Sequence, residues 1–342
     1  TFFLLVVVFL GFGNTDAQTE AEKLDEIDAM ITSFMAKHKI TGLSVGLLYK
    51  GKNELITHGR EGLTINDSTT FEIGSVTKTF TTYLLAKAIE TKKLNLNTTV
   101  GELLPTIKNK AVSTITLEEL ARHTSGLKTN PTTLKRRKKT LDPSELFTEK
   151  EFFASLEKEK VSKKKKGTES YSNTGIMLLG LCLEKGLGDS YTSLVEELFT
   201  TFKMPYANLS HFDKDNKLTQ GHFKNGKEAP LWSFNAFMPA GGIHASIIDM
   251  VAYTNYQMSH YNDELGQILF DLDIENDVCL GWFNRSLSND ANLYWHNGGT
   301  SGFSSYLGMI PQMKIGVIVL SNTSSPHIDD FAIRLINKVI QL

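Results

Sequence analysis

The segment Phe71–Thr91 reads FEIGSVTKTFTTYLLAKAIET, with a serine and a lysine at the start of a periodic stretch. Ser75 and Lys78 form an S-x-x-K motif, and Thr79–Thr91 has the apolar spacing of a helix. Residues three apart share one helical face, and a helix start offers backbone N–H groups to a developing anion. Serine is a weak nucleophile that needs a base. A lysine serves when burial lowers its pKa, so the segment predicts an activated serine.

The S-x-x-K pattern is common when taken alone. It recurs three times in this chain, at Ser125/Lys128, Ser155/Lys158 and Ser162/Lys165. A serine that caps a helix, followed by a surface lysine, gives the same sequence pattern. Only the motif at Ser75 follows a strand-like region and opens a strongly periodic helix, so further motifs are needed to favour chemistry over capping.

A second motif is Tyr171-Ser172-Asn173, in a polar segment directly before the apolar helical stretch Ile176–Leu183. The Y-x-N pattern also recurs twice elsewhere in the chain. We expect this copy to project from a loop into a cleft. A tyrosine beside Lys78 can relay protons, and the amide of Asn173 can hold a substrate carbonyl.

A third motif, His296-Asn297-Gly298-Gly299, is the only H-x-G in the chain. It is predicted to end a strand over Leu293–His296, where the glycines let a ligand approach the backbone closely. His296, Gly298 and Gly299 are therefore candidate substrate-binding residues. The backbone N–H of Gly299 is a candidate second oxyanion donor beside that of Ser75. A tight turn carrying a surface histidine is the alternative.

The remaining pattern predicts an α+β fold with strands at both ends of the chain. An amphipathic helix is expected over 20–38, then a hairpin of strands 43–49 and 54–58. Strands return at 293–296, 304–310 and 315–320, before a closing helix over 327–341. We predict an α/β sandwich whose antiparallel sheet comes from the N- and C-terminal parts (about 18–70 and 240–342). Helices flank it, and an all-helical region (about 75–239) is inserted.

Composition excludes several classes of protein. The 342 residues are 41% hydrophobic and 22% charged, which disfavours disordered and fibrous chains. Lys and Arg number 36 against 38 Asp and Glu, so no general basic field is available to bind nucleic acid. The runs Lys135–Lys139 and Lys163–Lys166 are interpreted as solvated loops. The second run lies five residues before Tyr171, so it is also a candidate for steering anionic substrates.

The first residues resemble a targeting segment. Phe2–Phe12 is almost wholly apolar and too short to span a bilayer, and Thr15-Asp16-Ala17 offers a cleavage point. We predict a signal peptide over 1–17, export to the periplasm or the extracellular medium, and no membrane span in the mature chain 18–342. A buried N-terminal strand is the alternative.

Cysteine and histidine usage indicates neither a disulfide framework nor a metal. There are two cysteines, Cys182 and Cys279, and Cys182 lies in an apolar helical stretch as a buried thiol would. Whether the two pair stays open. The nine histidines include no H-E-x-x-H motif, and we predict no metal and no cofactor.

At these residues the chain resembles the serine β-lactamase and penicillin-binding-protein superfamily. It is most similar to the class C-like branch, which includes D-aminopeptidases, esterases and animal mitochondrial relatives. The resemblance covers roughly Ile27–Asn322. It rests on the three motifs in the family's order and on three flanking stretches: Phe71–Ser75, Leu120–Leu127 and Pro239–Ile243.

The resemblance implies a site between the sandwich and the helical region. It implies acylation of Ser75 followed by hydrolysis, with Lys78 and Tyr171 sharing acid/base work and Asn173 binding the substrate amide. One departure is that many lactam-hydrolysing members have Lys-Thr-Gly where this chain has His-Asn-Gly. A histidine holds a substrate carboxylate only when protonated, near or below a pKa of about 6.5.

We therefore predict a serine hydrolase acting on a small-molecule or peptide acyl substrate: an ester, an amide or a D-amino-acid peptide. A true β-lactamase is the nearest alternative. A penicillin-binding or sensor protein that deacylates slowly is the alternative from another class. The oligomeric state and the natural substrate stay open.

Overall fold

The computed structural model describes residues 19–134, 142, 144–145, 147–209, 217–273, 275–287 and 291–342. The predicted signal peptide and the run Lys135–Lys139 lie outside the described residues. Within them, no helix is apolar and long enough to cross a membrane.

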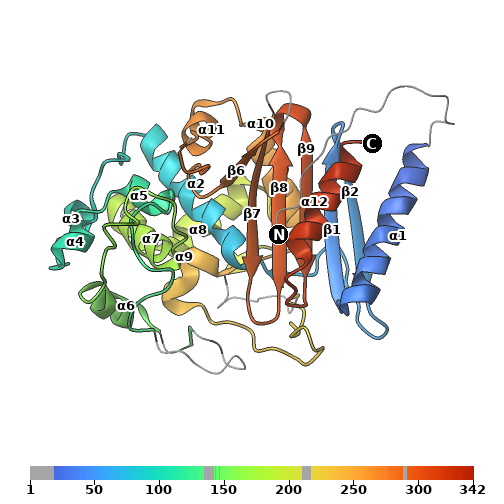
Figure 1. Ribbon diagram of the computed structural model, residues 1–342, viewed down its shortest axis with the longest axis horizontal. Helices are drawn as coiled ribbons and strands as arrows, with labels where there is room; N and C mark the ends of the chain where they lie inside the picture. Colours follow the sequence, from blue (N-terminus) through green and yellow to red (C-terminus); the bar gives the residue numbers. More distant parts are fainter. Residues whose placement is uncertain are drawn as a thin grey trace.

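A six-stranded antiparallel sheet organises the molecule, in the order β2-β1-β9-β8-β7-β6 (Figure 1). The C-terminal strand β9 pairs with β1, with Leu43 opposite Ser321, so the two ends of the chain form one sheet. The prediction of an antiparallel sheet built from both ends is confirmed. Its strands are β1 Gly42–Tyr49, β2 Lys52–Gly59, β6 Phe283–Ser286, β7 Asn292–Gly299, β8 Ser304–Ile310 and β9 Ile315–Ser321.

The central strands are buried on both faces, because alternate residues of a strand point to opposite sides. In β9, Val317 and Val319 pack in one hydrophobic core, whereas Ile318 and Leu320 pack in another. The first core is covered by the two terminal helices, α1 (Glu20–His38) and α12 (Ile328–Val339). These helices lie on one side of the sheet in Figure 1.

The terminal helices form where the sequence predicts them. Thr19 caps α1 in a reciprocal capping box with Glu22, and the C-cap residue after α1 is Lys39, whose φ of 57° is left-handed. The ring of Phe34 stacks on that of Phe331 of α12, with centroids 4.0 Å apart. This contact joins the two ends of the chain outside the sheet.

The second, larger core joins the other sheet face to the helical region. The region also contains a small sheet of β3 (Phe71–Glu72), β5 (Ile243–Ala245) and β4 (Asn208–Leu209), which the sequence does not predict. Its β3–β5 pairing joins segments that lie far apart in the sequence, so no local pattern signals it. The helices are α2 Thr77–Glu90, α3 Val100–Leu103, α4 Lys110–Ser113, α5 Leu117–Ala121, α6 Glu149–Leu156, α7 Asn173–Leu187, α8 Tyr191–Thr201, α9 Met238–Gly241, α10 Ile247–Ser259 and α11 Glu264–Leu269.

Helix α2 runs through the middle of the molecule and is buried on all sides along its first turns (Figure 1). Its threonines make this possible, because a buried hydroxyl must find a hydrogen-bond partner. Thr79 donates to the carbonyl of Val76 at 2.8 Å, and Thr81 donates to that of Pro239 at 2.6 Å. The helix that begins just after Ser75 is therefore fixed from every side.

Both cysteines are buried free thiols. The prediction that Cys182 is a buried thiol is confirmed, and the open question of a Cys182–Cys279 disulfide is answered in the negative.

Candidate active site

Ser75 lies in a single 3-10 turn, Gly74–Val76, between β3 and α2. It faces a cleft of about 1490 Å³. The cleft is lined by Ser75, Glu169, Tyr171, Phe223, Lys224, Asn225, Lys227, Glu228, Trp232, Phe283, Trp295, Asn297, Gly298, Gly299, Thr300, Ser301, Ser304, Ser324, Ser325, Pro326 and Asp329.

The amine of Lys78 lies directly beneath this serine. Its Nζ is 3.0 Å from Ser75 Oγ and donates a hydrogen bond to the carbonyl of Ala240 at 2.6 Å. The side chain is 0% exposed, and burial lowers the pKa of Lys78 well below its ordinary value. Burial thus favours the neutral form of the amine, which is the form that can accept a proton from the adjacent hydroxyl.

Tyr171 completes the contact from the helical side. Its hydroxyl hydrogen bonds with Ser75, and Lys78 Nζ lies 5.0 Å from the centre of its ring. Burial raises the pKa of Tyr171 above its ordinary value, and the hydrogen bond with Ser75 opposes this only in part. The phenol is therefore protonated at neutral pH. The Ser75 hydroxyl, the Lys78 amine and the Tyr171 phenol thus meet at one point, where burial disfavours charge on the amine and on the phenol.

Tyr171 is held in place by its neighbour Ser172 and by the His123 ring. Ser172 caps α7 by accepting the N–H of Gly175 at 2.9 Å, so the helix begins at Asn173 and earlier than the predicted stretch. The backbone N–H of Ser172 donates to Nδ1 of His123 at 3.3 Å. The His123 ring packs on Tyr171 with centroids 4.7 Å apart. Burial, with smaller contributions from Lys78 and His296, lowers the pKa of His123 well below its ordinary value, so this support is uncharged.

The backbone of the H-x-G motif packs against the turn that carries Ser75. The prediction that the strand ends at His296 is wrong: β7 continues to Gly299, because Gly298 and Gly299 pair with Ser305 and Ser304 of β8. A Cβ on Gly298 would lie 2.1 Å from the carbonyl oxygen of Ile73 and 3.0 Å from the Ser75 nitrogen. Glycine at 298 is therefore what lets the strand approach the nucleophile turn.

The facing turn needs a glycine for the same reason. Gly74 has a φ of 51°, and a Cβ there would lie 2.7 Å from the nitrogen of Gly299. The N–H groups of Ser75 and Gly299 thus belong to two segments in van der Waals contact beside Ser75 Oγ.

The side chain of His296 lies beneath the cleft and does not line it within the described residues. It is 0% exposed, its Nδ1 donates to the carbonyl of Asn297 at 2.6 Å, and its ring lies 6.2 Å from that of Tyr171. Burial, and secondarily the nearby Lys78, lowers the pKa of His296 to about 3. The ring is neutral at physiological pH and offers no fixed cation.

Asn173 is also outside the described lining of the cleft. Its side-chain amide donates to Oδ1 of Asn130 at 2.9 Å. The structure thus brings Ser75, Lys78 and Tyr171 into contact and lays Gly298 and Gly299 beside them. The side chains of Asn173 and His296 instead form hydrogen bonds with Asn130 and with the carbonyl of Asn297.

The sequence and the fold both resemble those of known proteins. A family model described as Beta-lactamase matches residues 27–340. The chain belongs to the β-lactamase family. It is therefore a serine hydrolase that works through an acyl-enzyme, as the resemblance predicts.

Relatives in the β-lactamase family are distant. The chain is 24% identical over 367 residues to a β-lactamase of Providencia stuartii, covering 93% of this chain and 92% of the relative. It is 25% identical over 347 residues to protein flp of Staphylococcus aureus strain MW2, covering 92% of this chain and 66% of flp.

Solved structures of class C β-lactamases share the fold, so the predicted fold class is confirmed. One from Rhodobacter sphaeroides has a TM-score of 0.77 at 20% identity, covering 92% of this chain and 98% of that chain. A D-alanine carboxypeptidase of Burkholderia cenocepacia has a TM-score of 0.78 at 22% identity, with coverages of 94% and 99%.

Several residues of this β-lactamase-family site are not assigned a role from the sequence. His123 and Ala240 lie in flanking stretches that carry the resemblance, but their contributions are a ring contact and a backbone carbonyl, which no motif names. Glu72 is likewise without a role predicted from the sequence. It lies three residues before Ser75, and its contact is with Trp232, on a loop that is distant in the sequence. Within the described ranges, no group of three or more His, Cys, Asp or Glu side chains could hold a metal ion.

Proposed function

We propose that Ser75 is the acylated nucleophile of this hydrolase and that Lys78 is its base. The observation that carries the proposal is the 3.0 Å contact between Ser75 Oγ and an amine whose pKa is lowered by burial. Tyr171, protonated and hydrogen-bonded with Ser75, would relay protons. The three groups form the nucleophile, base and orienting partner that covalent catalysis needs.

The proposed reaction has two balanced halves. Ser75 Oγ attacks the carbonyl carbon while its proton moves to Lys78 Nζ, and the N–H groups of Ser75 and Gly299 stabilise the oxyanion. The bond to the leaving group breaks, and that group receives the proton through Lys78 and Tyr171. Water then attacks the acyl-enzyme and gives a proton to the same pair. The acid leaves and Ser75 Oγ regains its proton.

The histidine of the H-x-G motif supplies no cation for a substrate carboxylate, which favours acyl groups without an obligatory carboxylate. Burial lowers the pKa of His296 to about 3, so its ring is neutral at physiological pH. Among the described residues, the lysines that line the cleft are Lys224 and Lys227, which lie outside this motif. The side-chain amide of Asn297 is already bonded to Asp329 Oδ2 at 2.6 Å, which places an acid rather than a base at that wall. We therefore propose esters, amides or D-amino-acid peptides as substrates ahead of β-lactams.

We further propose export of the mature chain to the periplasm or the extracellular medium. The apolar run near the start of the chain and its following small residues support this, together with membership of the β-lactamase family. A protein whose first 17 residues persist in the secreted fraction, as read by mass spectrometry of its N-terminus, would contradict the signal-peptide part.

A fluorophosphonate label followed by peptide mapping tests the nucleophile. We expect one labelled peptide containing Ser75, and no label on Ser75→Ala. Labelling of another serine in both proteins would overturn the assignment.

A panel of a neutral aryl ester, a D-amino-acid amide and nitrocefin then separates the substrate classes. We expect turnover of the ester or the amide to exceed that of nitrocefin. Fast nitrocefin hydrolysis would instead establish a true β-lactamase. A stable acyl adduct without turnover of any substrate would indicate a sensor.

A further inference from the structure

Trp232 forms part of the wall of the cleft and lies on a segment with unfavourable backbone angles. Two nearby residues on its C-terminal side, Phe234 and Asn235, have φ of 57° and 42° although neither is a glycine. Such conformations cost of the order of 1–3 kcal/mol each in general and persist only where surrounding contacts impose them. Contacts that fix this segment therefore decide where the Trp232 indole stands.

Buried carboxylates supply those contacts. Glu72 Oε1 accepts the backbone N–H of Trp232 at 2.7 Å. Asp142 Oδ2 accepts the next N–H, that of Ser233, at 2.7 Å and also its hydroxyl at 2.6 Å. The indole N–H of Trp232 donates to Ser301 Oγ at 3.0 Å, on the turn just beyond Gly299. Two acids thus hold consecutive residues of the wall.

Glu72 differs from Asp142 in its surroundings. It is 1% exposed and lies in β3, three residues before Ser75 and opposite His244 of β5. Its second oxygen, Oε2, faces Thr300 without the geometry of a hydrogen bond. One carboxylate therefore contacts the Trp232 wall and the strand turn beyond Gly299 from within the nucleophile segment.

We propose that Glu72 is a positioning residue: its carboxylate fixes the Trp232 wall relative to Ser75, and its protonation weakens substrate binding. The effect on binding rests on the proposed function at Ser75. A charged acceptor holds an N–H more strongly than a neutral one, so protonation loosens the strained segment. Burial, together with the nearby Asp142, raises the pKa of Glu72 to about 7, against smaller opposing effects of Thr300 and the Trp232 N–H.

The kinetic test compares the wild-type protein with Glu72→Gln on one neutral ester between pH 6 and pH 8. For the wild-type protein we expect KM to rise about 3- to 10-fold as the pH falls through 7, with kcat changing less. Glu72→Gln should show the higher KM at both pH values. Other ionisable groups are unchanged in the variant, so the difference between the two profiles isolates Glu72. Those around the cleft are Lys78, Glu169, Lys224, Lys227, Glu228 and Asp329, and those next to Glu72 are Asp142 and His244.

Asp142→Asn is the matched control, because it removes the other acid from the same segment. We expect it to raise KM and to leave the pH dependence of KM in place. If Glu72→Gln keeps the wild-type pH dependence, the proposal fails. A fall in kcat at constant KM in Glu72→Gln would also overturn it, since that result places the effect on the nucleophile turn instead.

A second measurement needs neither substrate nor a folded Glu72 variant. In a Trp295→Phe background, the remaining tryptophans are Trp232 and Trp282, and Trp282 is only 1% exposed. Acrylamide quenching should then report on Trp232 and should increase as the pH falls through 7. Unchanged quenching contradicts the positioning role even if the hydrolase is confirmed. Increased quenching in a chain that fluorophosphonate does not label would retain that role while the proposed function fails.

Discussion

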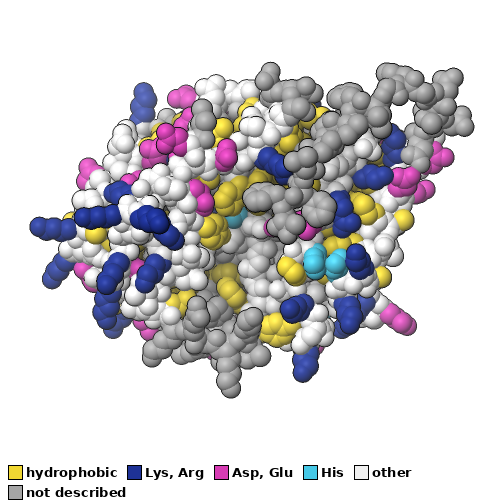
Figure 2. Space-filling model, in the orientation of Figure 1, with side chains coloured by type: hydrophobic (Ala, Val, Ile, Leu, Met, Phe, Trp, Pro, Cys, Tyr) yellow, Lys and Arg dark blue, Asp and Glu magenta, His cyan; other side chains and the backbone are white. Residues whose placement is uncertain are grey.

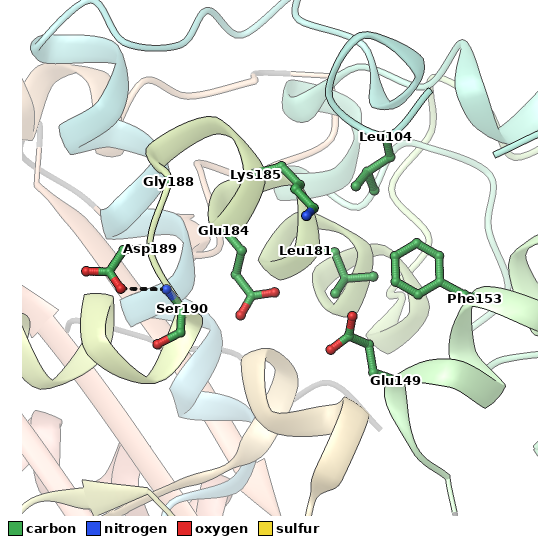
Figure 3. Close-up of a pocket in the computed structure, with 9 residues that line it drawn as sticks. All are labelled: Leu104, Glu149, Phe153, Leu181, Glu184, Lys185, Gly188, Asp189 and Ser190. Atoms are coloured by element: carbon green, nitrogen blue, oxygen red, sulfur yellow. Dashed lines mark hydrogen bonds between the residues drawn. The ribbon is translucent and has the colours of Figure 1, made fainter. Parts of the chain in front are cut away.

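Two of the hollows lined by described residues contain a serine, a lysine and carboxylates, and these groups are arranged differently in each. The first is the cleft at Ser75. The second, which we call the helical cavity, measures about 430 Å³ and lies in the helical region (Figure 3). It is lined by Leu104, Glu149, Phe153, Leu181, Glu184, Lys185, Gly188, Asp189 and Ser190.

The two lysines differ in the surroundings of the amine. Lys185 is exposed, and in Figure 3 its amine points toward Leu104 and away from Ser190. Ser190 Oγ is engaged in capping α8, where it accepts the N–H of Ser193 at 3.1 Å. Lys78 is fully buried and touches its serine. A serine and a lysine in one hollow are therefore not enough; the proposed base at Lys78 depends on the burial of its amine against the serine.

The largest expected effect is on the buried pair. We expect Ser75→Ala and Lys78→Ala each to reduce kcat by roughly 10³-fold or more, with the double variant little worse, because catalytic groups act as a unit. Steady-state kinetics on the substrate found by the panel measures this. Ser190→Ala and Lys185→Ala are the matched controls and should keep wild-type turnover. Near-normal rates in Ser75→Ala would break the distinction between the two hollows.

The next largest effect is expected at the phenol. Tyr171→Phe keeps the ring that packs on His123 but removes the hydroxyl that contacts Ser75, so kcat should fall about 10²-fold. Fluorophosphonate labelling should slow, while the melting temperature stays within a few degrees of the wild-type value. An unchanged kcat would show that Lys78 moves the proton without a relay, and would leave Tyr171 as packing alone.

The sequence predicts the buried pair Ser75 and Lys78 better than the part of the cleft wall at Trp232. The S-x-x-K spacing and the helix after it are local, so the sequence alone is enough to place Ser75 and Lys78 together. The terminal helices and both strand pairs near the chain ends also follow from local periodicity. His296 could be assigned to the site, but not its burial, because the packing of Phe283 and Tyr171 around its ring involves three distant segments.

The wall depends on contacts that sequence patterns do not describe. Glu72 is adjacent to the nucleophile motif, yet its partner Trp232 is 160 residues away. The carbonyl of Ala240 that meets Lys78 is a backbone group and has no side-chain signature. Contacts with backbone acceptors and pairings between distant segments therefore cannot be predicted from sequence patterns, whereas local motifs identify the candidate reacting side chains.

A smaller effect is expected for stability at Glu72. A folded-state pKa of about 7 exceeds the ordinary value of 4.5, so the folded protein binds this proton more tightly than the unfolded chain. Its contribution to stability is complete below pH 4.5 and is lost as the pH rises through 7. Glu72→Gln lacks this loss, so its free energy of unfolding should fall by about 2–3 kcal/mol less than that of the wild-type protein between pH 5 and pH 8. Urea unfolding at pH 5 and pH 8 measures it, and an equal change in unfolding free energy for both proteins would contradict the buried charge.

The smallest expected effect concerns the lysine run 163–166, which lies outside both hollows. Its lysines are exposed, and Figure 2 shows Lys and Arg side chains gathered over the helical side of the molecule. Lys166 pairs with Glu119 at 3.2 Å. Burial raises the pKa of Glu169 at the cleft edge, and Lys165 opposes this in part. The field of the run therefore reaches the cleft but is screened by salt over about 8 Å at physiological ionic strength.

Replacing all four lysines with glutamine should reduce kcat/KM for an anionic ester by only about 2- to 3-fold at about 20 mM salt, and by less at about 200 mM. A neutral ester should be unaffected at either concentration. This outcome would mean that catalysis depends on the buried groups at Ser75, and that the exposed lysines affect only the rate at which an anionic substrate reaches the cleft. An equal loss for both esters would instead indicate that the run supports the Tyr171 segment, because a loss of steering cannot slow a neutral substrate.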